Sequence, residues 1–146
     1  MSGTHYDLIV VGGGGAGMMG AITAARLGAE VCLLERNPKV GRKLYITGKG
    51  RCNVTNHCTP EEALAATTRN GRFLYSSISR TTPANVEEFF TGLGVELKVE
   101  RGRRVFPVSD KAEEIRQALL RYAQDADIVY DGAKKLLLED IVPEAE

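Results

Sequence analysis

A glycine cluster between two short apolar runs limits most strongly how this chain can fold. The spacing G-x-G-x-x-G is formed by Gly12, Gly14 and Gly17. The run before it, residues 7–11, reads DLIVV, and a second run, residues 31–34, reads VCLL. Short β-branched apolar runs predict buried parallel strands, and the glycines predict a tight turn into a helix between them. The sequence therefore predicts a βαβ unit over residues 1–36.

The helix of this unit is expected from Gly15 to Leu27. Small residues recur through it at helical spacing, at Gly17, Ala21, Ala24 and Gly28. A face of small residues lets a helix pack closely on a sheet, so this face is predicted to lie against the strands. Gly28 is predicted to end the helix, because glycine readily adopts the left-handed conformation that follows a helix C-terminus.

The order of these parts indicates a dinucleotide site. The first glycine permits the tight turn, the second permits backbone to approach a pyrophosphate, and the third permits close packing of helix and strand. The helix N-terminus presents free N–H groups to the phosphates. Glu35 ends the second strand, where its carboxylate can accept hydrogen bonds from ribose hydroxyls and would repel a 2′-phosphate. Glycine-rich turns alone are common in α/β proteins, so the prediction depends on the complete order.

Further helices, a hairpin and parallel strands are predicted after the βαβ unit. Ser109 or Asp110 is expected to cap the last helix, and the third strand is expected beside the second. Ile9 and Val11 would then lie at an open sheet edge, which favours association. The expected elements are a loop over 37–56, helices over 60–68, from Thr82-Pro83 to Gly94 and over 111–123, hairpin strands over 95–100 and 104–108, and parallel strands over 128–130 and 134–138.

Composition argues against several classes of partner. Lys plus Arg and Asp plus Glu both total 19 in 146 residues, so no net charge attracts nucleic acid or an anionic membrane. The arginines at 101, 103 and 104 lack interleaved aromatic residues, so they are interpreted as a solvated turn or a contact with a further domain. Three cysteines fit a reducing cytoplasm. Cys52, His57 and Cys58 match no standard zinc spacing, so no metal site is expected.

Long segments of the chain resemble a known flavoprotein family. They include residues 41–43 (GRK), 46–56 (ITGKGRCNVTN), 69–73 (RNGRF), 89–97 (FFTGLGVEL) and 99–112 (VERGRRVFPVSDKA). These runs resemble the aminoacetone oxidase/BaiN-like group of NAD(P)/FAD-dependent oxidoreductases, whose FAD domain is of the glutathione-reductase type. The resemblance implies FAD as the cofactor and allows NAD(P)H as the electron donor.

The resemblance also implies roles for particular residues. Arg42 and Lys43 would line the path of the cofactor, although a solvated surface charge is the ordinary alternative for them and for Arg51. Cys52 near a flavin is either a redox partner or simply a small buried side chain. The full set of residues expected at the cofactor is Gly12, Gly14, Gly15, Ala16, Gly17, Glu35, Arg36, Arg42, Lys43, Gly50, Arg51, Cys52, Asn53 and Ala133.

The predicted fold is α/β, a Rossmann-like parallel sheet that is incomplete against the resembled family and carries a helical and β-hairpin insertion. The expected segments are the βαβ unit over 1–36, a cofactor loop over 37–58, helices plus hairpin over 59–124, and further strands over 125–140. Members of the resembled family are longer, and the open edge is expected to have one of three consequences: the chain associates through it as a homodimer, is part of a longer protein, or is only marginally stable alone.

The predicted function is the FAD-binding portion of a flavin-dependent oxidoreductase acting on a small molecule. No catalytic residue is assigned, because the resembled family places that region beyond residue 146. Two alternatives remain at this stage: a non-catalytic nucleotide-binding or assembly module, and the same unit with NAD in place of FAD. Glu35 suits either adenosine half, so only the segment from Gly41 to Asn56 favours FAD.

Overall fold

The structure, a computed structural model, describes residues 5–123 and the strand at 127–130. The described chain forms two compact units. The first contains residues up to Arg42 together with Ala123 and the strand at 127–130, and the second contains Lys43–Tyr122. The strand predicted over 134–138 lies outside the described residues.

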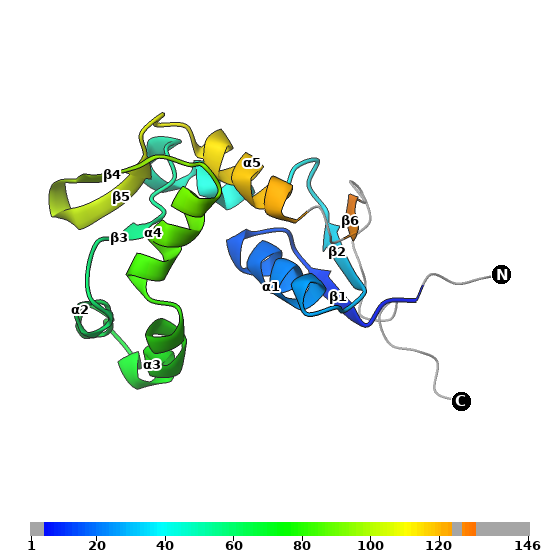
Figure 1. Cartoon of the computed structure of the whole chain (residues 1–146), viewed down its shortest axis with the longest axis horizontal. Helices are drawn as coiled ribbons and strands as arrows, with labels where there is room; N and C mark the ends of the chain where they lie inside the picture. The colour runs from blue at the N-terminus through cyan, green and yellow to red at the C-terminus, as the bar shows by residue number, and fades with distance from the viewer. Residues whose placement is uncertain (1–4, 124–126, 131–146) are drawn as a thin grey trace. The chain divides into compact units, whose positions relative to one another are not determined.

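The first unit contains the predicted βαβ structure (Figure 1). Its elements are β1 (Leu8–Val11), α1 (Gly15–Arg26), β2 (Val31–Glu35) and β6 (Asp127–Tyr130). All strand pairs are parallel, and the order across the sheet is β1-β2-β6. The prediction that the third strand lies beside the second is confirmed, since β2 pairs with β6 along four residues of each strand.

Most side chains of β2, the central strand of the described sheet, are buried. Val31, Cys32 and Leu33 are at most 4% exposed. The predicted face of small residues is only partly correct, because α1 buries the larger Met18 and Ile22 beside Ala21 while Gly28 is exposed. Small residues are therefore needed for a close approach of α1 to its neighbours only near the start of the helix. Its predicted end is confirmed by Gly28, at φ +91° directly after the C-cap residue.

The outer strand β1 exposes apolar side chains. Leu8, Ile9 and Val11 are 40%, 50% and 60% exposed. β1 pairs only with β2 among the described strands, so it is one edge of that sheet. Within the described residues, β1 is therefore an open sheet edge with exposed apolar side chains, as the sequence predicts.

The second unit combines short helices with a small antiparallel sheet. No helix in the part of the chain that the structure describes is long and apolar enough to cross a membrane. Before the first strand lie the 3₁₀ turns η1 (Arg42–Tyr45), which begins at the boundary of the two units, and η2 (Thr47–Lys49). The further elements are β3 (Thr55–Asn56), α2 (Pro60–Ala65), α3 (Gly71–Arg80), α4 (Pro83–Gly92), β4 (Leu97–Glu100), η3 (Arg101–Arg103), β5 (Arg104–Pro107) and α5 (Ala112–Tyr122).

The predicted hairpin is confirmed, but the sheet has one strand more than predicted. β4 pairs antiparallel with β5, and β3 adds to the other side of β5 through the pair Thr55 and Val105. A strand of two residues has too little alternation to stand out in a sequence. In the turn of the hairpin, Arg103 pairs with Glu62, so it is not simply a solvated charge.

One predicted helix is longer than the helix in the structure, and one helix of the structure was not predicted. α2 ends at Ala65 rather than near residue 68, and α3 was not predicted. Asn70 is the N-cap residue of α3, but it has φ +53° and its side chain makes no capping hydrogen bond. In contrast, Thr82 caps α4 with a reciprocal capping box, as its Thr-Pro start indicates. Near α5, Ser109 Oγ accepts the N–H of Lys111 at 3.3 Å.

Replacing Leu33 by alanine tests the core of the first unit. Leu33 is fully buried, so Leu33→Ala is expected to lower the free energy of unfolding by about 2–5 kcal/mol. Leu27→Ala is the matched control, because Leu27 is 84% exposed and its loss should change stability by no more than about 0.5 kcal/mol. Urea unfolding followed by circular dichroism measures both, and equal effects would contradict the assigned core.

Candidate functional site

The glycine loop after β1 is held by three hydrogen bonds of its backbone groups, two with backbone partners and one with a side-chain carboxylate. The N–H of Gly12 donates to the carbonyl of Leu34 at 2.8 Å, while Gly12 itself has φ +102°. The N–H of Gly13 donates to Glu35 Oε2 at 2.8 Å, and the carbonyl of Gly13 accepts the N–H of Gly41 at 2.7 Å. Both the N–H and the carbonyl of Gly13 are therefore hydrogen-bonded within the protein. The glycine motif had indicated Gly12 and Gly14 rather than Gly13.

Gly17 shows why the third glycine of the motif is needed. A Cβ atom at this position would lie 1.9 Å from the carbonyl oxygen of Gly12. No side chain can occupy that space without moving the backbone. Gly17 thus permits α1 to lie close to the loop backbone at Gly12, and a Cβ there would also lie 3.5 Å from the side chain of Val10 in β1.

Gly14 lies beside open space instead. A Cβ atom built on Gly14 meets no atom within 4 Å, and the residue is the N-cap of α1. The first N–H groups of a helix have no partner within the helix, and α1 carries no acidic side chain in its first turn. An anion such as a pyrophosphate is suited to this end of the helix by charge and by hydrogen bonding. The loop thus fits the phosphates of a dinucleotide.

Glu35 is a buried carboxylate with three N–H donors. Besides Gly13, the backbone N–H and the side-chain amide of Asn37 donate to Oε1 at 2.8 and 2.6 Å. Burial by itself raises the pKa of Glu35, but the hydrogen bonds from Asn37 and Gly13 outweigh it and hold the pKa below its usual value. A carboxylate has about four acceptor positions, so about one remains for a ribose hydroxyl.

Asn37 is a residue that the sequence analysis missed. It orients Glu35, and its own Oδ1 accepts a hydrogen bond from Arg42 Nη1 at 3.4 Å. Arg42 is thereby linked to the loop through Asn37 and Glu35. Arg36 and Lys43 are exposed side chains. The available signal was position, since Asn37 follows two residues after the acidic end of β2.

The predicted residues Gly50–Asn53 lie in a strained loop of the second unit. Gly48, Lys49, Gly50 and Cys52 all have positive φ angles. Arg51 is not a free solvated charge, since its Nη1 donates to Glu100 at 2.9 Å and its guanidinium lies 4.1 Å from the Phe106 ring centre. The backbone N–H of Asn53 donates to Thr47 Oγ1 at 3.3 Å.

Cys52 is a buried thiol, only 2% exposed. Burial raises its pKa, and a hydrogen bond with Thr47 opposes the rise only in part. The thiolate is the reactive form of cysteine, so this environment favours the packing interpretation of Cys52 over the redox interpretation. Within the described ranges, no group of three or more His, Cys, Asp or Glu side chains could hold a metal ion.

The predicted cofactor residues divide between the two units. The first unit contains Gly12, Gly14, Gly15, Ala16, Gly17, Glu35, Arg36 and Arg42, and the second contains Lys43, Gly50, Arg51, Cys52 and Asn53. Ala133 lies outside the described residues.

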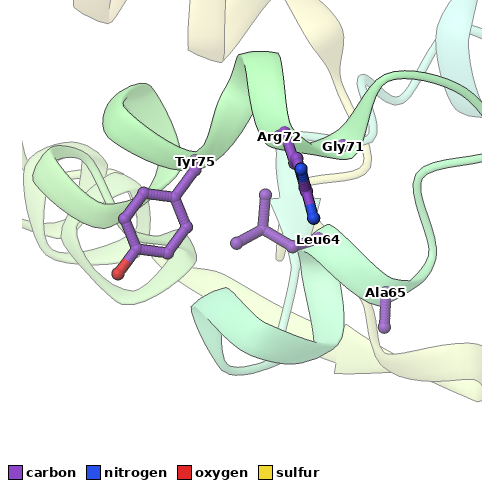
Figure 2. A pocket seen from close by; sticks show the side chains of 5 residues that line it. All are labelled: Leu64, Ala65, Gly71, Arg72 and Tyr75. Atoms are coloured by element: carbon purple, nitrogen blue, oxygen red, sulfur yellow. The ribbon is translucent and has the colours of Figure 1, made fainter.

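A hollow of about 540 Å³ lies on α2 and α3 of the second unit. Figure 2 shows Leu64 between the side chains of Tyr75 and Arg72. Ala65 and Gly71 complete its lining. None of the predicted cofactor residues lines this hollow, so it is not part of the dinucleotide pattern.

Comparison with known families identifies the chain. The HI0933-like protein Rossmann domain matches residues 6–138, so the chain belongs to this family. It is the FAD-binding Rossmann portion found in flavin-dependent oxidoreductases, as the resemblance of its loops indicated.

Two relatives and one solved structure illustrate the match. The 3-dehydro-bile acid delta(4,6)-reductase of Clostridium scindens is 36% identical over 115 residues, which are 75% of this chain and 27% of that protein. The ribosomal RNA dihydrouridine synthase of Escherichia coli K12 is 28% identical over 126 residues, 86% of this chain and 31% of that protein. This chain thus spans about a third or less of the length of either relative.

The solved structure is the 3-ketosteroid-delta4-(5alpha)-dehydrogenase of Rhodococcus jostii. It aligns with a TM-score of 0.61 at 17% identity, over 86% of this chain and 38% of that one. At this identity the likeness supports the fold alone, and it agrees with a partial Rossmann-type domain.

Substitution of Gly17 tests the close contact with Gly12. Gly17→Ala is expected to lower the free energy of unfolding by about 1–3 kcal/mol, because the new methyl group overlaps a backbone carbonyl. Gly20→Ala in the same helix is the control, since its Cβ would meet no atom within 4 Å. The control should stabilise α1 by about 0.5–1 kcal/mol. Thermal and urea unfolding compare them, and similar results for both variants would contradict the contact.

Glu35 predicts a pH dependence of stability. Its pKa is lowered in the folded state from an ordinary value of 4.5. The ionised carboxylate therefore stabilises the fold above that pH, and this contribution is lost as the pH falls through the folded pKa. Glu35→Gln should cost about 2 kcal/mol at pH 7, because the amide keeps one acceptor oxygen but has an NH₂ group, which cannot accept, in place of the other.

The same variant should lose less stability than the wild type on acidification below pH 4.5. Urea midpoints between pH 7 and pH 3 measure this difference. Glu61→Gln is the control, since Glu61 is an exposed carboxylate of α2. Parallel pH curves for wild type and Glu35→Gln would contradict the assigned role of this carboxylate.

Proposed function

We propose that this member of the HI0933-like family forms part of a flavin-dependent oxidoreductase that acts on a small molecule. The observation that carries the proposal is the prepared loop ahead of α1. Gly13 is fixed to the ionised Glu35 at 2.8 Å, while the space beside Gly14 is open to a ligand. Backbone held in advance binds a diphosphate at a lower cost in conformational entropy.

Each group of residues has a part in holding FAD in this proposal. The loop from Gly12 to Gly17 binds the pyrophosphate with N–H groups of the helix start. Glu35 accepts a ribose hydroxyl with its remaining acceptor position. Arg42, fixed through Asn37 at 3.4 Å, adds positive charge along the cofactor path together with Lys43. The loop at Gly50–Asn53 serves the flavin end.

Bound FAD supplies the transfer of two electrons between substrate and a second redox partner, which we propose to be NAD(P)H. The chain's own contribution is to bind and orient the cofactor. A small-molecule substrate is supported by the relative named as a bile acid reductase. The relative named for ribosomal RNA has a similar match to this chain. Substrate choice therefore depends on residues outside the segment they share.

The setting proposed for this protein is the cytoplasm, without a membrane or nucleic-acid partner. All three cysteines are free thiols, which fits a reducing compartment. The exposed residues Leu8, Ile9 and Val11 on β1 would be covered by a further part of the protein or by a second copy of this chain. Light scattering tests association of the chain by itself, and a stable monomer would exclude the second copy.

A variant of Gly14 tests dinucleotide binding separately from folding. Gly14→Val places a side chain in open space, and the φ of −73° at this position is allowed for valine. The variant should keep its stability but weaken binding of FAD by at least about a hundredfold, since a blocked phosphate site loses several charge-assisted bonds. Flavin fluorescence and ADP titration measure the affinities.

Gly20→Val is the matched control, because Gly20 also adjoins open space but lies further along α1. It should bind FAD as the wild type does. Unchanged FAD binding by Gly14→Val would reject the proposed site. Binding of ADP and NAD with no preference for FAD would favour NAD as the cofactor, and binding of none of them would favour a non-catalytic module.

A further inference from the structure

The loop Thr47–Asn53 adopts a conformation that its own sequence does not favour. Lys49 and Cys52 have φ angles of +58° and +63°, in the left-handed region that side chains avoid. Gly48 and Gly50 add φ angles of +61° and +89°. Such a run persists only where surrounding contacts determine it, so the contacts of this loop identify what holds it.

Arg51 binds both its own loop and the hairpin. Its Nε donates to the carbonyl of Gly48 at 3.1 Å, inside the left-handed run. Its Nη1 donates to both carboxylate oxygens of Glu100 at 2.9 and 3.0 Å, and reaches Asp110 at 3.4 Å. One guanidinium thus joins the loop to the end of β4 and to the segment before α5.

An aromatic ring completes the attachment. The guanidinium carbon of Arg51 lies 4.1 Å from the ring centre of Phe106, which is fully buried. The same ring lies against the loop backbone, since a Cβ on Gly48 would be 2.5 Å from Phe106 Cε1. The Phe106 ring therefore lies against the loop at two residues, Gly48 and Arg51.

The charges around Arg51 are balanced within the second unit. Lys98 Nζ lies 2.7 Å from Asp110 Oδ2 and 3.4 Å from Glu100 Oε1. Two cations thus face two carboxylates, and a further hydrogen bond joins Ala112 N–H to the carbonyl of Gly50 at 3.0 Å.

We propose that Arg51 is a positioning residue, which holds the loop Thr47–Asn53 in its left-handed conformation through Glu100 and Phe106. The Nη1 and Nε groups of Arg51 are already bound to Glu100 and Gly48, so its effect on FAD acts through the loop backbone. Only one part of this inference rests on the proposed function, namely that the loop serves the flavin end of FAD. The attachment of the loop exists within the second unit without any ligand.

Cys52 provides a direct readout of the loop. Its thiol is 2% exposed and follows Arg51 directly, so a thiol reagent reaches it only when the loop opens. The full chain is treated with N-ethylmaleimide without FAD, and peptide mass spectrometry gives the labelling rate at each cysteine. Cys32, buried in β2 of the first unit, reports any general loss of structure.

Glu100→Gln should raise the labelling rate of Cys52 about three- to tenfold, as expected for loss of a partly exposed charged hydrogen bond. Arg51→Lys should raise it similarly, because lysine lacks the planar fork and stacks poorly. Asp110→Asn should have a smaller effect, since its contact with Arg51 is longer at 3.4 Å. The rate at Cys32 should stay constant in all three variants.

Glu62→Gln is the matched control. Glu62 pairs with Arg103 at 2.9 and 3.0 Å, which is the same chemistry between more exposed side chains of residues outside the loop Thr47–Asn53. This variant should leave Cys52 labelling unchanged. Wild-type rates at Cys52 in Glu100→Gln and Arg51→Lys would overturn the proposal, and so would an equal rise at Cys32.

A second readout separates the positioning role from a merely structural one. Glu100→Gln should weaken FAD binding while ADP binding stays constant, because the loop serves only the flavin end. Equal losses for both ligands would overturn this role of the loop. If the wild type binds neither ligand while Cys52 labelling still responds to Glu100→Gln, the proposed function fails and the attachment by Arg51 stands.

Discussion

The hydrogen bond from the N–H of Gly13 to the carboxylate of Glu35 is the interaction on which the first unit depends. It joins the loop after β1 to the last residue of β2, at 2.8 Å. Burying a carboxylate is costly unless its oxygens are bound, and Asn37 supplies the two further donors. The same charge that fixes the loop is the one that we propose to bind a ribose, and in that proposal folding and ligand binding share a single side chain.

The second unit uses a related arrangement with the opposite charge. There the guanidinium of Arg51 binds the Gly48 carbonyl and a carboxylate at the end of β4. In both units a charged side chain binds glycine-rich backbone, Glu35 from the end of the central strand β2 and Arg51 from within its own loop. Glycine-rich loops have high conformational entropy when free, so such an attachment helps each loop to keep one conformation.

Local signals explain which features could be predicted. The apolar runs, the glycine spacing and the Thr-Pro start of α4 act over a few residues, so the βαβ unit, the hairpin and their order were correctly predicted. The helix α3 and the short strand β3 carry weak local signals, since α3 begins with a glycine, a poor helix former, and β3 has only two residues. Their formation depends on packing against α2 and pairing with β5.

The sequence by itself determined the dinucleotide unit, because glycine positions and an acidic strand end limit the backbone directly. It also determined the family, through long runs of matching residues. Only the tertiary structure decided how the site residues are held. Gly13, Asn37 and Glu100 were not among the predicted residues. Asn37 lies only two positions after Glu35, but Gly13 lies 22 positions before Glu35, and Glu100 lies 49 positions after Arg51. The two longer-range contacts form only when the fold brings distant segments together, and no local pattern encodes them.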